Sequence, residues 1–281
     1  MNQGTAAPPV TAENVFGRAA SGVAGFVEEF GRILQFTGQV FVTLVRPPFR
    51  FTLLLQQCEF VGVGSIFIIL LTGTFTGAVF TLQSIDAFAQ VGMETMVGST
   101  VLVAVARELA PVLTSLMVTG RVASAMATEL GTMRVSEQID AMEVMAVNPL
   151  GYLVVPRVVA TALMTPVLTV IFTMVSTVGS YLVAVKGRGI DEGTFFYRIE
   201  WFLDPFDFTH GLYKAAVFGF ILAIIGCYKG FHATGGARGV GIATTQAVVI
   251  GSISIFVLDY VLTSILLKLE PGYYDLPVVP L

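Results

Sequence analysis

Charged residues are scarce in this sequence, and cysteine and histidine are almost missing. Only 12% of the 281 residues are charged, against about 25% in a typical soluble domain. The formal net charge is −4, so the chain has no excess of basic residues with which to bind nucleic acid. We therefore expect no nucleic-acid partner.

The few cysteines and histidines stand apart from one another. Cys58 and Cys227 each lie in or beside an apolar run, which indicates packing roles rather than a disulfide framework. His210 and His232 lack the i, i+4 pairing of a helical zinc site. We predict neither a metal site nor a cofactor bound by this chain.

Long apolar runs are abundant. Hydrophobic residues make up 55% of the chain, and the mean hydropathy is +0.82. The run at 60–85 has no charged residue and would be about 39 Å long as a helix, enough to cross a hydrocarbon core of about 30 Å. Further spans are predicted at 98–128, 158–185, 210–228 and 242–267. The expected fold class is an all-α integral membrane protein with five transmembrane helices.

The remaining residues suggest a division into four parts. Residues 1–12 are small, polar and proline-containing, so we expect a disordered tail. Residues 13–59 combine a helical apolar pattern with glycines and charges, which favours an interfacial amphipathic helix and an elbow. A transmembrane domain at 60–268 and a C-terminal tail at 269–281 follow. Because Arg18 precedes the first long apolar run by many residues, we expect insertion through internal spans and no cleaved signal peptide.

The span pattern also predicts an orientation. With the N-terminus inside the cell, eight Lys and Arg residues lie on the inner side and five on the outer side, a small bias in the expected direction. This places residues 129–149 and a glycine-rich turn at 229–241 in the cytoplasm. The turn lacks the Gly-Lys-Ser/Thr ending of a phosphate-binding loop, so we expect no nucleotide there.

Inside the span pattern, Gly73-x-x-x-Gly77 puts two glycines on one helix face. Such spacing permits a neighbouring helix to approach closely in a membrane. The motif is common by chance, so it predicts packing and nothing more specific.

The most charged segment in the middle of the chain runs from Glu129 to Pro149. Ser136 is the expected N-cap of a short helix, and Asn148-Pro149 is expected to end it. The apolar residues that recur at helical spacing on one side are Val135, Ile139, Met142 and Ala146. The pattern predicts an amphipathic helix at about 136–147. It is either a plain connection or, given its acidic groups beside flexible methionines, a surface for a partner protein.

Ionisable residues also occur within the spans, where each costs roughly 2.5–3.5 kcal/mol on insertion scales. Arg107 and Glu108 are adjacent and point about 100° apart on a helix, so each needs a partner elsewhere. We expect Lys214 to extend outward, Asp259 to need a donor or a proton, and Arg121 to have a structural role.

Several motifs occur in the order of a known family. They are Arg-Glu-Leu-Ala-Pro-Val-Leu-Thr from Arg107, Gly120-Arg121, Glu129-Leu130-Gly131-Thr132-Met133, Glu137-Gln138-Ile139 and Met145-Ala146-Val147-Asn148-Pro149. Through them, residues from about 30 to 270 resemble the MlaE/YrbE family. Its members are permease subunits of lipid-moving ABC transporters that work with MCE-domain proteins.

The resemblance implies a function and a set of partners. The chain would be a non-catalytic permease in the bacterial inner membrane, moving phospholipids or related lipids between membranes and serving outer-membrane lipid asymmetry. It would form a homodimer and assemble with an ABC ATPase that binds ATP and magnesium, an MCE-domain assembly and a small STAS-type regulatory subunit. The acidic helix would be the coupling helix that docks into the ATPase.

The resemblance also assigns residues. Those expected to contact the ATPase are Glu129, Met133, Glu137, Gln138, Asp140 and Met142. Those expected near the lipid cavity are Arg107, Glu108, Phe75, Phe80, Leu102 and Val105. For Arg107 and Glu108 two interpretations stay open. Either they hold the helices of the bundle together, or they line the lipid pathway, where Arg107 would attract a phosphate.

Two other classes of protein stay open as well. A secondary transporter or channel would use the buried charges as an ion path and would work without ATP. An intramembrane lipid-modifying enzyme would use Glu108, Asp259 and His210 in acid-base roles, although their spacing matches no known catalytic pattern. The helix with Glu137-Gln138 argues against a secondary transporter, which has no need to display it. Turnover of a lipid by the purified chain alone would indicate the enzyme.

Overall fold

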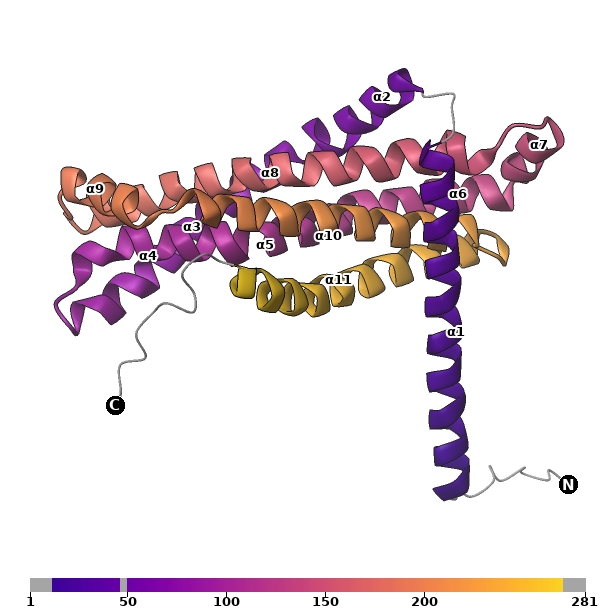
Figure 1. Ribbon diagram of the computed structural model, residues 1–281, viewed down its shortest axis with the longest axis horizontal. Coiled ribbons are helices and arrows are strands. Elements are labelled where there is room, and N and C mark those ends of the chain that lie inside the picture. The colour runs from indigo at the N-terminus through magenta and orange to yellow at the C-terminus, as the bar shows by residue number, and fades with distance from the viewer. Residues whose placement is uncertain (1–11, 46–49, 270–281) are drawn as a thin grey trace, which may run out of the picture.

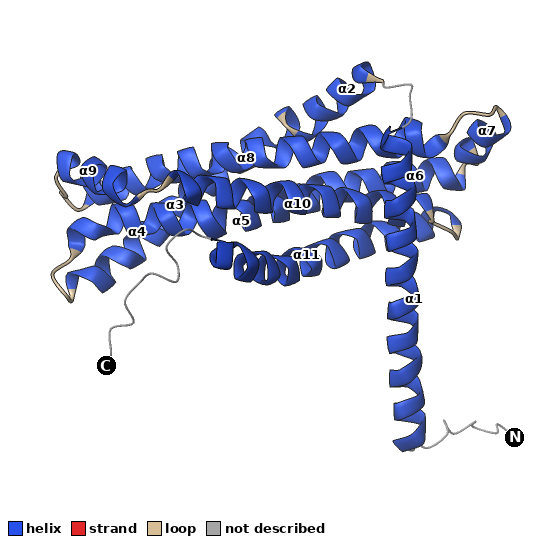
Figure 2. Cartoon of the chain, in the orientation of Figure 1, coloured by secondary structure: helices blue, strands red, loops and turns tan. Residues whose placement is uncertain are grey.

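The structure is a computed structural model that describes residues 12–45 and 50–269. Every regular element in those ranges is helical (Figure 2). The α-helices are α1 (Ala12–Val45), α2 (Phe51–Val61), α3 (Val63–Ala89), α4 (Val97–Ala104), α5 (Ala110–Val118), α6 (Ser124–Val135), α7 (Gln138–Val144), α8 (Val155–Tyr181), α9 (Glu192–Phe202), α10 (Pro205–Phe231) and α11 (Gly236–Leu269). A 3-10 turn, η1 (Glu94–Met96), and the π-helical segments η2 (Val105–Leu109), η3 (Thr119–Ala123), η4 (Leu150–Val154) and η5 (Leu182–Gly187) connect some of them.

Within the described residues, five helical stretches are long and apolar enough to cross a membrane. They are Phe51–Ala89, Glu94–Val135, Leu150–Gly187, Pro205–Phe231 and Gly236–Leu269. The prediction of an all-α membrane protein with five spans is therefore confirmed. The stretches exceed the predicted spans because helical hydrogen bonding continues past the last apolar residues. The first one begins at Phe51 instead of residue 60, since α2 precedes α3 with only Gly62 between them.

The spans lie lengthwise beside one another, and α1 crosses one end of the bundle nearly at right angles (Figure 1). That is the direction of a helix lying along a membrane surface. The same end carries α7 and the turn between α10 and α11, whereas α9 lies at the opposite end. The predicted tails lie outside the described residues, except that Ala12 begins α1 and Leu269 ends α11.

Small residues let α3 and α8 pack closely. A Cβ atom on Gly77 would overlap the Ser176 carbonyl group, and one on Gly179 would overlap the Thr74 carbonyl group. At Gly73 the Ser176 hydroxyl donates a hydrogen bond of 2.8 Å to the carbonyl oxygen. The close approach predicted from Gly73 and Gly77 is confirmed, and it supplies packing where lipid provides little hydrophobic driving force.

The interior of the bundle is rich in hydroxyl groups. On α8, Thr161, Thr165, Thr169 and Thr173 are buried, and each donates a hydrogen bond to the carbonyl oxygen four residues earlier. These bonds satisfy polar groups at membrane depth without a partner helix. In contrast, α3 and α11 expose many large apolar side chains, so their outer faces must meet lipid or another protein.

At the far end, acidic side chains cap two helices. The Asp191 carboxylate accepts a hydrogen bond of 2.8 Å from the Thr194 amide and one of 2.9 Å from the Thr194 hydroxyl, which holds the pKa of Asp191 below its usual value. The Asp204 carboxylate caps α10, while Asp207 accepts a hydrogen bond of 3.0 Å from the Asp204 amide. Asp207 is thereby positioned for a second role inside the bundle.

Candidate functional site

The segment around α7 turns sharply on both sides of the helix. Glu137, at its N-cap, has φ 60°, and Ala146, just beyond its end, has φ 57°. Left-handed backbone is uncommon for residues other than glycine, and it clusters at functional positions. The predicted N-cap is wrong: Ser136 ends α6, where its hydroxyl donates to the Thr132 carbonyl oxygen at 2.8 Å. The helix therefore covers Gln138–Val144 only.

Ion pairs connect this segment to two spans. Arg134 of α6 pairs with Asp140 of α7. Glu129 of α6 lies 2.9 Å from Arg157 of α8, and the Arg157 side chain is buried. Ion pairs thus join α7 to α6 and α6 to α8.

The two faces of α7 differ in burial. Ile139 is fully buried, and Met133 and Met142 pack against the core. Val144 and Met145, at the tip, are 89% and 67% exposed. Exposed polar residues lie at both ends of the helix, with Glu137 and Gln138 at its start and Glu143 next to the tip.

Among the residues predicted to contact an ATPase, Glu137 and Gln138 thus face outward, while both methionines lie inward. The exposure of Val144 was not predicted, because helical periodicity alone does not show where the helix ends. Its apolar side chain directly after Glu143 was the available signal.

A network of charges links the second, fourth and fifth spans, on a part of the second span well before α7. Arg107, in η2, forms an ion pair with Asp207 at the start of α10. The ammonium group of Lys214 pairs with Glu108 and lies 3.1 Å from Asp259 Oδ1 on α11. The partners that Arg107 and Glu108 require thus come from other helices, as their geometry on one helix predicts.

Pro111 explains one further contact of Lys214. Proline has no amide N–H, so it cannot bond the carbonyl oxygen four residues earlier, which belongs to Arg107. Lys214 Nζ lies 3.4 Å from that oxygen. Together with the π-helical geometry of η2, this places a backbone acceptor, two carboxylates and one ammonium group in a single cluster.

The network is buried unevenly. The Lys214 side chain is completely buried, so the expectation that it extends outward is wrong; its three acceptors lie inside the bundle. The side chain of Glu108 is 38% exposed and that of Arg107 is 24% exposed. One edge of the network therefore reaches the surface of the single chain beside α11, where the Thr263 hydroxyl lies 3.4 Å from Glu108.

The apolar residues predicted near the lipid cavity lie in different places. Phe75 is 63% exposed on α3, and Phe80 is partly buried on the same helix. Leu102 and Val105 are buried, where they share a small space with Phe195 of α9. α3 packs mainly on α8, so the structure does not bring the two phenylalanines to the charged network.

Arg121 connects the second span to the first. Its Nη1 donates hydrogen bonds of 2.9 Å to the Phe60 carbonyl oxygen and to the Ser65 hydroxyl. The guanidinium also lies over the Phe60 ring, and a Cβ on Gly64 would overlap it. Arg121 thereby joins η3 to the beginning of α3. Within 12–45 and 50–269, no three His, Cys, Asp or Glu side chains are grouped to hold a metal ion.

Five apolar helical stretches, a charged network shared among three of them and a short acidic helix tied to two of them define a multi-pass membrane transport subunit. The family model "Permease MlaE" matches residues 54–265. The chain therefore belongs to the MlaE permease family, and it is an ABC transporter permease subunit.

Relatives from several bacteria agree with this assignment. A probable ABC transporter permease protein of Rickettsia bellii is 39% identical, over 86% of this chain and 93% of the relative. A probable ABC transporter permease protein of Synechocystis is 41% identical, over 81% and 86% respectively. The intermembrane phospholipid transport system permease protein MlaE of Haemophilus influenzae is 35% identical, over 85% and 94%.

Proposed function

We propose that this chain is the transmembrane subunit of an ABC transporter that moves phospholipids or related lipids between membranes. The name of the Haemophilus influenzae relative supports this class of substrate. The observation that carries the proposal is the geometry of α7, an acidic helix with an exposed apolar tip that is tied by ion pairs to α6 and, through α6, to α8. We place the chain in the bacterial inner membrane, with α7 in the cytoplasm.

A separate ATPase would supply the energy. It would bind ATP and magnesium, and its closure would displace α7. The ion pair between Arg134 and Asp140 would carry that displacement to α6, and the pair between Glu129 and Arg157 would carry it to α8. Rigid-body movement of packed helices is a common way to open and close a cavity. This chain itself would make or break no covalent bond.

A second copy of the chain would complete the lipid pathway. The outer face of α11 exposes Ile253, Phe256 and Tyr260, and the partly exposed carboxylate of Glu108 lies beside the same helix. A charge at membrane depth must face protein or water. Contact between two copies along α11 would shield this edge and enclose a cavity between them.

Arg107 and Glu108 would lie at the wall of that cavity. Arg107 is already paired with Asp207, so a lipid phosphate would share the guanidinium rather than find it unoccupied. A guanidinium has five N–H donors, which permits both contacts at once. On the far side of the membrane, the aromatic residues of α9 would face an MCE-domain assembly. A small STAS-type regulatory subunit is proposed from the family resemblance.

Reconstitution in lipid vesicles tests this function. The chain is co-purified with its ATPase, and transfer of a fluorescent phospholipid to acceptor vesicles is measured. We expect transfer with ATP and none with a non-hydrolysable analogue. Transfer by the chain alone, driven by an ion gradient, would instead establish a secondary transporter. Chemical conversion of the lipid by the chain alone would establish an enzyme.

A further inference from the structure

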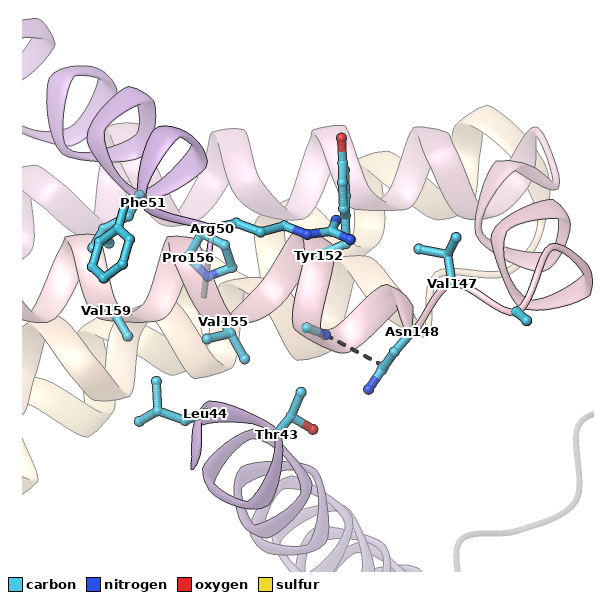
Figure 3. A pocket seen from close by; sticks show the side chains of 13 residues that line it. Thr43, Leu44, Arg50, Phe51, Val147, Asn148, Tyr152, Val155, Pro156 and Val159 are labelled. Carbon is cyan, nitrogen blue, oxygen red and sulfur yellow. Dashed lines mark hydrogen bonds between the residues drawn. The ribbon is translucent and has the colours of Figure 1, made fainter. Parts of the chain in front are cut away.

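A cavity of about 450 Å³ lies where α1 ends, α2 begins and the chain leaves α7 (Figure 3). Its walls are the last residues of α1, residues 50–54 and residues 146–159. We call it the Arg50 groove. A Cβ on Gly151 would lie 3.1 Å from a methyl carbon of Thr43, so glycine lets α1 approach η4 and close one wall. None of the charged network around Lys214 lines the groove.

One end of the groove is polar and positive. The Arg50 guanidinium carbon lies over the Tyr152 ring, 4.4 Å from its centre, as a cation–π pair (Figure 3). A guanidinium carries five N–H donors in a planar fork that matches the oxygens of a phosphate. Among the described residues that line the groove, Arg50 is the one charged side chain. The nearby Asn148 oxygen is engaged by the Leu150 amide at 3.1 Å.

The other end of the groove is apolar. Phe51, Leu54, Val155 and Val159 line it. Phe51 also begins the first apolar stretch that is long enough to cross a membrane. The groove therefore lies at the end of the bundle where the first span begins. A single cation at the mouth and an apolar wall below it are complementary to an amphipathic anion.

We propose that the Arg50 groove binds one anionic glycerophospholipid of the surrounding membrane. Its phosphate contacts the N–H donors of Arg50 beside the Tyr152 ring, and the upper part of one acyl chain lies along Leu54, Val155 and Val159. A volume within the range of about 300–1,000 Å³ suits a partly enclosed ligand. The second acyl chain stays in the bilayer. Anionic lipids are abundant in cytoplasmic leaflets, which is the side given to this end of the bundle.

The bound lipid would also contact the exit from α7. Ala146, Val147 and Asn148 line the groove, and Ala146 is one of the two residues with left-handed backbone that bound this helix. The lipid would thus hold the end of α1, the beginning of α2 and the connection from α7 to α8 together. The binding assignment itself requires only that the chain spans a membrane, so it does not depend on which lipid is transported.

Native mass spectrometry of the full chain in mixed micelles tests the site. The micelles contain either anionic phosphatidylglycerol or zwitterionic phosphatidylcholine, and the bound lipid per chain is measured. We expect preferential retention of phosphatidylglycerol. Arg50→Gln should weaken that retention about tenfold, the loss expected for a hydrogen-bonded charged contact. Arg238→Gln, which removes the same charge from an exposed position at the same end of the bundle, should retain phosphatidylglycerol like the wild type.

Two further measurements separate the alternatives. Val159→Trp fills the apolar end and should lower retention while Arg50 is intact, so the result does not rest on a single variant.

Inorganic phosphate at the same concentration should leave the lipid bound; complete displacement would show that a free anion suffices and would overturn the lipid assignment. Equal retention by wild type, Arg50→Gln and Val159→Trp would also overturn it. Arg107→Ala should leave the effect of Arg50→Gln unchanged, which separates this site from the transport pathway.

Discussion

At the scale of single residues, Lys214 holds the charged network together. Its ammonium group is the one contact shared by Glu108, Asp259 and the Arg107 carbonyl oxygen. All of these groups are contributed by spans, where no bulk water replaces a lost partner. Two carboxylates thus depend on one buried cation.

Replacing Lys214 with methionine keeps the length of the side chain and removes its charge. We expect Lys214→Met to destabilise the chain by about 3 kcal/mol, the lower end of the loss for a buried pair, because it leaves two partly exposed carboxylates within the spans without their cation. The measurement is the temperature of unfolding in detergent. Lys268→Met, at an exposed position near the end of α11, is the control. The triple variant with Glu108→Gln and Asp259→Asn should recover most of the loss; no recovery would show that packing, not charge, explains the effect.

Arg107 has two possible roles, and a second substitution separates them. Arg107→Ala should reduce co-purifying phospholipid by about tenfold if the guanidinium binds headgroups, as lipid mass spectrometry would show. The single variant also leaves the buried Asp207 without its cation. We therefore expect the same loss of lipid in Arg107→Ala combined with Asp207→Asn. Full recovery of lipid in the double variant would restrict Arg107 to a structural role.

At the scale of elements, α7 is a short helix with one face fixed to the bundle and one exposed end. Its inner face is fixed by the buried Ile139 and by the pair between Arg134 and Asp140. Its outer end presents Val144 and Met145. Exposed apolar residues surrounded by polar ones are typical of the central contacts of an interface.

Val144→Asp should therefore weaken binding of the ATPase by about 2 kcal/mol, roughly 30-fold, as expected for a central contact residue. Glu137→Lys should act in the same direction through charge. Co-purification of the ATPase and its lipid-stimulated hydrolysis are the measurements. Val91→Asp changes another exposed valine, in the connection between α3 and η1 (67% exposed, against 89% for Val144), and should have no effect. Normal co-purification of Val144→Asp would contradict the assignment of α7 as the coupling helix.

At the scale of the whole molecule, the exposed apolar faces of α3 and α11 must meet either lipid or another protein. Both helices expose large apolar residues, but only α11 also borders the partly exposed edge of the charged network. This asymmetry favours α11 as the face between two copies and α3 as the face toward lipid.

Cysteine cross-linking distinguishes the two faces. In a background with Cys58 and Cys227 replaced, Phe256→Cys on α11 should form a covalent dimer in native membranes under mild oxidation. Phe67→Cys on α3 is comparably exposed and should stay monomeric. A dimer through Phe67→Cys and none through Phe256→Cys would reverse the assignment. Gel electrophoresis without reductant is sufficient to read the result.

The sequence by itself determined the five spans, the acidic helix between the second and third, and the need of Arg107 and Glu108 for partners on other helices. Apolar length, helical periodicity and the angle between neighbouring side chains are local properties, so they can be read along the chain. The tight contact at Gly73 and Gly77 was predictable for the same reason.

Only the tertiary structure decided which groups meet. Arg107 pairs with Asp207 one hundred positions away, and Lys214 turns inward because helix packing brings two carboxylates and a carbonyl oxygen freed by Pro111 to its ammonium group. The exposed tip at Val144 and the Arg50 groove likewise depend on where α7 ends and how α1 approaches η4. Such contacts join distant segments, and no local pattern in the sequence records which helix faces which.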